Sequence, residues 1–308
     1  MRLLLLTALT MTAFAANSVL NRMALADGLA DAGSFATLRL IAGALMLAAL
    51  VWWRGRGWSR GGRGARAMAG AVAALLLYLY AFSAAYARLD AGLGALILFG
   101  VVQVTMFAAG LLRAEPTPPR RWIGAALAFA GLAWLLWPAG GPQVSPVHGA
   151  AMAAAGLGWG LYSLAGHGAT DALGATAANF VLAVPAGLAA WAGLMIADVV
   201  PMPSMVPAGA ALAVLSGAVM SGLGYALWYT VLPRLPRAVA AVVQLTVPVI
   251  AMTGGAVLLA ERPGLPALLA AALVLGGVGV SVLPARGAAR NAARATVPGQ
   301  MTSGSSGS

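Results

Sequence analysis

The stretch of sequence that decides the fold of this chain is residues 237–263, RAVAAVVQLTVPVIAMTGGAVLLAERP. Between residues 238 and 260 it contains no charged residue, and at about 1.5 Å of rise per residue a helix of this length crosses a hydrocarbon core of roughly 30 Å. We therefore predict a transmembrane helix here. Its middle is interrupted by Gln244 and Pro248, which lie four residues apart and so share one helix face. A polar side chain and a lost backbone hydrogen bond both need a partner other than lipid, so this face is expected to look toward a cavity or neighbouring helices.

The composition of the whole chain agrees with this class. Of 308 residues 61% are hydrophobic and only 8% are charged, which leaves too few polar groups to cover a soluble domain. We predict an all-α integral membrane protein with short loops. There is no cysteine, and two histidines cannot form a typical zinc site, so no metal and no cofactor are expected. Ten transmembrane helices are predicted near residues 3–22, 33–53, 67–87, 91–112, 121–137, 147–167, 175–197, 208–231, 238–260 and 264–284.

The arginines predict the orientation. All 18 basic residues are arginine, and with the N-terminus inside, 14 of them fall on one side, which is typical of the cytoplasmic side. Both termini are therefore expected in the cytoplasm, with the chain in a bacterial inner membrane. The arginine-rich loop at residues 52–68 is interpreted as touching anionic lipid headgroups. The alternative is that it binds RNA or a specific lipid. On the first interpretation, no nucleic-acid partner is expected. The 14 are Arg2, Arg54, Arg56, Arg60, Arg63, Arg66, Arg113, Arg120, Arg121, Arg234, Arg237, Arg286, Arg290 and Arg294.

The two ends of the chain need separate interpretations. Residues 1–18 have a basic start, an apolar middle and an Ala-Phe-Ala ending, so they fit a cleaved signal peptide as well as a first helix. Cleavage would leave nine helices and spoil the repeat described next. Residues 286–308 are predicted to form a polar cytoplasmic tail, whose final SGSSGS resembles a remnant of recombinant expression.

The chain matches itself when shifted by 146 residues. This shift sets Gly131 against Gly277 and Glu115 against Glu261, and the glutamates are informative because the chain has only seven acidic residues. Five helices per copy is an odd number, so the second copy must enter the membrane from the opposite side. Inverted repeats are typical of secondary transporters, whose substrate site lies between the two halves. We predict the repeats over residues 1–140 and 146–285.

Two stretches carry a resemblance to a known family. FAANSVLNRMALADGLADAGSFATLRLIAGALML, at residues 14–47, resembles the opening of EamA-type proteins of the drug/metabolite transporter (DMT) superfamily, with an arginine, Arg39, in the second helix. QLTVPVIAMTGGAVLLAERPGLPALLAAALVLGGVGVSVL, at residues 244–283, resembles their closing pattern. The chain is most similar to YddG-type aromatic amino-acid exporters. The resemblance covers residues 3–284 and implies ten helices, a central cavity between the first, third, fourth, sixth, eighth and ninth helices, and export of small metabolites.

Polar and aromatic side chains fall on those six helices. Amides can meet an ammonium or a carboxylate without the desolvation cost of a fixed charge, and aromatic rings can hold an apolar side chain or an ammonium group. We therefore expect a monomeric carrier of several amino acids, such as phenylalanine, tyrosine, tryptophan, methionine and threonine. The predicted substrate-binding residues are Asn17, Tyr78, Phe99, Gln103, Trp159, Tyr162, Tyr225 and Gln244.

Several of these side chains also have a plainer interpretation. Asn17 can form a hydrogen bond between helices, worth about 1 kcal/mol, with no ligand involved. Arg39 is the only charge embedded in a predicted helix, near the outer end of that helix, and we expect it to cap carbonyls or reach the membrane interface rather than to bind substrate. Tyr and Trp gather at membrane interfaces, which is how we interpret Trp52, Trp53, Trp58, Trp122, Trp137 and, as an alternative to the cavity, Tyr229.

The transport mechanism is predicted from the charged residues that the helices lack and from the glycines and prolines that they contain. No predicted helix contains an embedded acidic residue and no cluster of Lys and Arg could hold a sugar phosphate, so transport is expected to run down the substrate's own gradient. For each glycine that we assign to helix motion, the alternative is that it only lets two helices pack closely. The predicted hinge or close-packing residues are Pro185, Pro248, Gly158 and Gly160.

Two other function classes compete with transport. A membrane enzyme would need an acid/base pair, but His148 and His167 lie at opposite ends of one predicted helix, more than about 25 Å apart. We therefore expect no enzymatic activity. A scaffold would leave the polar mid-membrane face without a role. Export of other small metabolites or drugs remains the alternative within the same superfamily.

Overall fold

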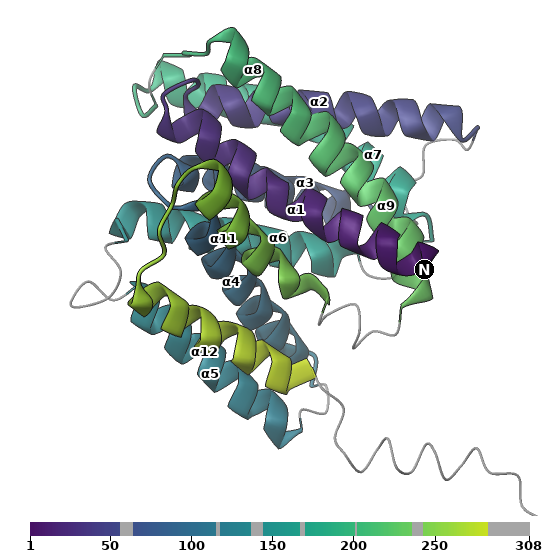
Figure 1. Cartoon of the computed structure of the whole chain (residues 1–308). Helices are drawn as coiled ribbons and strands as arrows, with labels where there is room; N and C mark the ends of the chain where they lie inside the picture. Colours follow the sequence, from purple (N-terminus) through teal and green to yellow (C-terminus); the bar gives the residue numbers. More distant parts are fainter. Residues whose placement is uncertain are drawn as a thin grey trace, which may run out of the picture.

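The structure is a computed structural model that describes residues 1–55, 64–114, 118–136, 144–166, 170–200, 202–235 and 243–282. Within these ranges the chain folds as a bundle of helices joined by short connections (Figure 1). Several residues singled out above lie outside the described ranges: Arg56, Trp58, Arg60, Arg63, Glu115, Trp137, His167, Arg237 and residues 286–308.

Each of the ten predicted ranges contains a helix. The eighth is composite, because α8 continues into a π-helix, η1, then α9 and a short 3-10 turn, η2. The bounds are α1 (Arg2–Ala26), α2 (Ala32–Trp53), α3 (Ala65–Tyr86), α4 (Ala91–Leu112), α5 (Pro119–Leu136), α6 (Pro146–Gly166), α7 (Ala172–Ile196), α8 (Pro207–Val214), η1 (Leu215–Leu223), α9 (Gly224–Val231), η2 (Leu232–Arg234), α11 (Thr246–Leu258) and α12 (Leu265–Val282).

Side chains and prolines mark where helices begin. The Asp31 carboxylate accepts the Ser34 N–H at 2.8 Å before α2, and Asp171 accepts the Gly174 N–H at 3.0 Å before α7. Such caps satisfy backbone donors that the first turn leaves without a partner. The helices α5, α6 and α8 each begin at a proline, whose missing N–H costs nothing at that position.

Six helices are long and apolar enough to cross a membrane: α1, α2, α3, α4, α7 and the composite helix Pro207–Arg234. The described parts of α11 and α12 are apolar but shorter, at Thr246–Leu258 and Leu265–Ser281. The chain is therefore a multi-pass membrane protein. That all ten helices cross the membrane stays a prediction.

The helix pairings recur after five helices. Helix α3 packs on α6 as α1 packs on the composite eighth helix, and α4 packs on α6 as α11 packs on α1. Helices α2 and α7, α4 and α11, and α5 and α12 pair with each other, and Figure 1 shows α5 and α12 side by side at one edge of the bundle. Gly277 lies in the α5–α12 contact, where a Cβ would collide with the Gly124 carbonyl. Two inverted five-helix repeats would give this pattern, although the repeat itself stays a prediction.

The described helix is broken between Gln244 and Pro248, because Val243 and Gln244 are helical, Leu245 is not, and α11 follows; a hinge role for Pro248 stays a prediction. Helix α11 begins at Thr246, so Pro248 lies in its first turn, where it removes no helical hydrogen bond. Pro185 lies inside α7. The irregular helix of the bundle is the eighth one, in which nine residues, Leu215–Leu223, form the π-helix.

One end of the bundle is tied together by an ionic cluster. The Arg22 Nε at the end of α1 donates to Glu261 Oε1 at 3.2 Å, and Arg22 Nη2 lies 3.6 Å from Asp90 Oδ1. Glu261 also accepts the Ala91 N–H, at 2.9 Å to Oε2, across to the start of α4. We call Arg22, Asp90, Ala91 and Glu261 the Glu261 cluster. At the same end, Asp31 accepts the Ser204 N–H at 2.7 Å and joins the α1–α2 connection to the α7–α8 connection.

Candidate functional site

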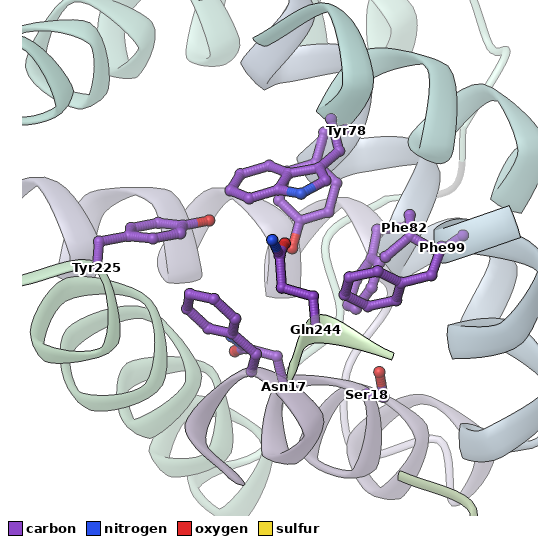
Figure 2. A pocket seen from close by; sticks show the side chains of 10 residues that line it. Asn17, Ser18, Tyr78, Phe82, Phe99, Tyr225 and Gln244 are labelled. Atoms are coloured by element: carbon purple, nitrogen blue, oxygen red, sulfur yellow. The ribbon is translucent and has the colours of Figure 1, made fainter. Parts of the chain in front are cut away.

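A cavity lies where six helical segments meet. Its lining residues come from α1, α3, α4, α6, α9 and Gln244, a helical residue just before α11, so all six helices implied by the family resemblance contribute. The empty space among them is about 420 Å³, counting the part that opens to the surroundings. The lining residues, drawn in Figure 2, are Phe14, Asn17, Ser18, Tyr78, Phe82, Leu98, Phe99, Trp159, Tyr225 and Gln244.

The structure brings together six of the eight predicted substrate-binding residues: Asn17, Tyr78, Phe99, Trp159, Tyr225 and Gln244. The other two lie outside the lining. Tyr162 is buried behind Trp159, with ring centroids 5.7 Å apart, and its hydroxyl accepts a hydrogen bond from Asn179 Nδ2 at 3.3 Å. Gln103 lies one turn beyond Phe99 on α4, half-buried. Substrate binding by any of the eight remains a prediction.

Four lining residues were absent from the predicted set. Phe14 and Phe82 lie three and four residues from Asn17 and Tyr78, on the helix faces that helical spacing assigns to the cavity. Ser18 and Leu98 carry no comparable signal, because small and aliphatic residues are ordinary in any transmembrane helix.

Aromatic rings form a continuous wall across the cavity. Trp159 of α6 lies 5.0 Å from the Tyr78 ring of α3 and stacks on the Tyr225 ring of α9 at 5.6 Å with an interplanar angle of 18°. Phe14 of α1 continues the wall at 5.7 Å from Tyr225. Such rings offer a large apolar area, and their faces also attract cations.

Glycines in α6 allow this wall to form. A Cβ on Gly158 would lie 2.7 Å from the Tyr78 backbone nitrogen, so only glycine lets α6 approach α3 this closely. A Cβ on Gly160 would lie 2.8 Å from the Thr105 side chain of α4. Both glycines therefore have a packing role, and a hinge role remains a prediction.

Amide groups supply the polarity of the cavity. Asn17 Oδ1 accepts from Ser216 Oγ at 2.7 Å, and its Nδ2 donates to Ser221 Oγ at 3.5 Å. Both serines belong to η1, so Asn17 makes the interhelical hydrogen bonds considered above and also lines the cavity. In Figure 2 the Gln244 amide extends into the space between Tyr78 and Tyr225.

Arg39 corrects one prediction. Its side chain neither reaches the membrane interface nor caps carbonyls: it is 0% exposed, and its Nη2 donates to the Tyr78 hydroxyl at 3.0 Å and to Ser221 Oγ at 3.5 Å. The guanidinium carbon lies over the Phe82 ring at 4.9 Å and the Tyr78 ring at 5.4 Å. Both rings line the cavity, so Arg39 forms a layer directly behind its wall.

The aromatic residues assigned to the membrane interface differ among themselves. Trp52 and Trp53 are 83% and 84% exposed at the end of α2, and Trp122 is also exposed. Tyr229 is half-buried, and its hydroxyl accepts from Thr176 Oγ1 at 3.0 Å, so it links α9 to α7. His148 Nδ1 lies 2.8 Å from Ser145 Oγ at the start of α6. Among the described residues, no three His, Asp or Glu side chains are grouped as a metal site would require.

Comparison with known proteins supports one family. The profile of the EamA-like transporter family matches residues 1–137 and 149–283. A protein of Pseudomonas aeruginosa, described as uncharacterized, is 49% identical over 293 residues, which is 94% of this chain and 97% of that protein. A crystal structure of another protein matches 92% of this chain and 98% of its own with a TM-score of 0.63 and 20% identity, so this likeness concerns the fold alone.

Proposed function

Because this chain belongs to the EamA-like transporter family, we propose that it is a secondary transporter that exports amino acids, both aromatic and other neutral ones, with broad specificity. The family is one of membrane transporters rather than enzymes. Within the DMT superfamily, the proposal assigns the chain to the YddG-type exporters. It acts as a monomer in a bacterial inner membrane, with both termini in the cytoplasm.

The observation that carries this proposal is the composition of the cavity wall. Six aromatic residues surround two amide side chains, and no charged residue is among those that line the cavity. A free amino acid is a zwitterion with no net charge, so amides can pair with both ends while rings cover the apolar side chain. Trp159 and Tyr225 give a flat surface that tolerates rings and unbranched chains alike, which favours several substrates over one.

Because both halves of the chain line the cavity, we expect the transporter to work by alternating access. The cavity lining draws on both halves of the chain, with Asn17 and Tyr78 from the first and Trp159, Tyr225 and Gln244 from the second. Rocking of one half against the other would expose this cavity to each side in turn. The Glu261 cluster then closes the periplasmic side, and transport runs down the amino-acid gradient.

The experiment that tests the function is counterflow of radiolabelled phenylalanine in proteoliposomes. Wild-type protein should accumulate the label, and amino acids such as methionine and threonine should compete. Gln244→Ala should lower the initial rate about tenfold, since one hydrogen bond to a charged group is worth about 1.5–3 kcal/mol. Thr253→Ala, on the exposed face of α11, is the matched control and should keep the wild-type rate.

The competitors separate the alternatives. If a quaternary ammonium drug or a sugar phosphate competes and amino acids do not, the chain transports another substrate class of the superfamily. If no compound exchanges while Gln244→Ala and Trp159→Ala leave the folded protein unaffected, transport itself is the wrong proposal. Product formation without exchange would point to an enzyme.

A further inference from the structure

Arg39 is a buried cation whose hydrogen bonds are incomplete. The side chain is fully enclosed, and of its three guanidinium nitrogens only Nη2 has partners. Nε and Nη1 have no hydrogen-bond partner among the described residues. Arginine keeps its proton in proteins, so this group stays charged where it lies. A desolvated charge with unsatisfied donors is costly unless something else compensates it.

The described residues offer no carboxylate to compensate this charge. The two ion pairs in the described part of the chain both belong to Arg22, in the Glu261 cluster. The six described acidic residues lie at helix ends or in connections, at Asp27, Asp31, Asp90, Asp171, Asp198 and Glu261. A positive charge without a carboxylate partner among the described residues therefore faces the rings that form the cavity wall.

Tyr78 connects this charge to the cavity. Arginine only donates, so the Tyr78 hydroxyl oxygen accepts the 3.0 Å bond from Nη2 and keeps its own proton for an acceptor. A hydroxyl that accepts from a cation becomes a stronger donor, because hydrogen bonds in a chain polarise one another. Figure 2 shows the Tyr78 ring reaching into the same space as the Gln244 amide.

We infer that Arg39, acting through Tyr78, is the positioning residue for a carboxylate on the transported molecule. The inference rests on the proposed function and deepens it, because it assigns which group of the substrate lies where. The carboxylate accepts from the Tyr78 hydroxyl and offsets the Arg39 charge. The ammonium group lies toward Gln244 and the faces of Trp159 and Tyr225. A cation without a carboxylate is repelled by Arg39.

Three phenyl compounds test this assignment. They are 3-phenylpropionate, which lacks the amine, phenethylamine, which lacks the carboxylate, and phenyl phosphate. Each is titrated by calorimetry into the purified full-length protein beside phenylalanine. Phenylalanine and 3-phenylpropionate should bind at least tenfold more tightly than phenethylamine. Equal binding of the acid and the amine overturns the inference, and tighter binding of phenyl phosphate than of 3-phenylpropionate overturns the carboxylate assignment.

Variants separate positioning from structure. Arg39→Gln should weaken 3-phenylpropionate about tenfold and leave phenethylamine unchanged or tighter, whereas Arg39→Lys keeps the charge but loses the stacked guanidinium and should weaken the acid less than Arg39→Gln does. Tyr78→Phe removes only the hydroxyl and should also weaken the acid selectively, which serves if Arg39→Gln does not fold. Equal weakening of acid and amine in both Arg39→Gln and Tyr78→Phe would show a purely structural role and sink the inference.

The outcome is independent of the counterflow result. If 3-phenylpropionate binds in an Arg39-dependent way but phenylalanine neither binds nor exchanges, the carboxylate site stands and the amino-acid proposal fails. If phenylalanine exchanges but the acid and the amine bind equally, the transporter stands and Arg39 has no such role.

Discussion

The carboxyl of Glu261 has a pKa above its ordinary value of 4.5, because burial disfavours the charge and the Asp90 carboxylate repels it. The Ala91 N–H and Arg22 lower this pKa but do not fully compensate. Folded protein therefore holds the Glu261 proton more tightly than unfolded protein does. The resulting contribution to stability is fully present below pH 4.5 and is lost as the pH rises through the folded-state pKa.

This sign gives a prediction at the scale of one residue. Glu261→Gln cannot titrate, so the melting temperature of wild type minus that of Glu261→Gln should fall as the pH rises above 4.5 and then level off. The measurement is a set of thermal melts in detergent between about pH 4 and 7. A difference that grows with pH would mean that the Arg22 ion pair outweighs burial.

At the scale of helices, the approach of α6 to α3 depends on Gly158. Because a Cβ there would meet backbone atoms of Ala74 and Tyr78 at 2.8 and 2.7 Å, the helices would have to separate. Gly158→Ala should destabilise the protein by about 1–3 kcal/mol, despite the gain in helix propensity, and should lower phenylalanine counterflow.

A matched variant on the partner helix checks this prediction. Gly70 of α3 has no atom within 4 Å of its would-be Cβ, so Gly70→Ala should keep or slightly raise the melting temperature. Equal melting temperatures for the two variants would mean that α6 can shift at no cost.

The extents of the helices could be predicted from the sequence because lipid demands long apolar runs, and the cavity could be predicted in part. The start of α4 matches its predicted range, and Trp159 and Gln244 do line one cavity. What failed depends on neighbours distant in sequence. An arginine inside an apolar helix can extend to the interface or turn inward, and for Arg39 the inward choice depends on Tyr78 and Ser221.

The π-helix η1 was beyond prediction for the same reason. Its sequence, LSGAVMSGL, is an ordinary small-residue stretch. Its geometry is matched to two other helices. Ser216 and Ser221 bond to Asn17 of α1, and a Cβ on Gly217 would collide with the Arg39 carbonyl of α2. π-helical turns often lie at functional sites. Here η1 contacts Asn17, which lines the cavity, and Arg39, which lies behind the cavity wall.

At the scale of the whole molecule, the Glu261 cluster should hold the helices together at the end of the bundle where the cluster lies. The half of α4 that begins beside it, from Ala91 to Gly100, is largely buried, whereas the half beyond Gln103 is not. Glu261→Ala removes the acceptor of both Arg22 and the Ala91 N–H and should open this end. Glu261→Gln keeps an acceptor oxygen and should leave it mostly closed.

Cysteine labelling measures this opening directly, because the chain has no cysteine of its own. In a Ser18→Cys background, which places a thiol in the cavity lining, an impermeant thiol reagent is added to either side of the vesicles. Adding Glu261→Ala should speed labelling from one side by about tenfold, which corresponds to about 1.4 kcal/mol. Asp27→Asn, exposed at the same end, is the control. Unchanged labelling in Glu261→Ala would assign the cluster a role in folding alone.

The pairing of α5 with α12 has a consequence for how the chain is made. These two helices pack mainly on each other and reach the rest of the bundle through α4. Helix α5 ends at Leu136 and α12 begins only at Leu265, so the ribosome must add more than a hundred residues before α5 meets its partner. Throughout that interval the Gly124 and Gly131 face of α5 lies against lipid or the insertion machinery. The synthesis of α12 is therefore also the step at which this edge of the protein assembles, and a chain truncated before α12 would present an unfinished surface to membrane quality-control proteases.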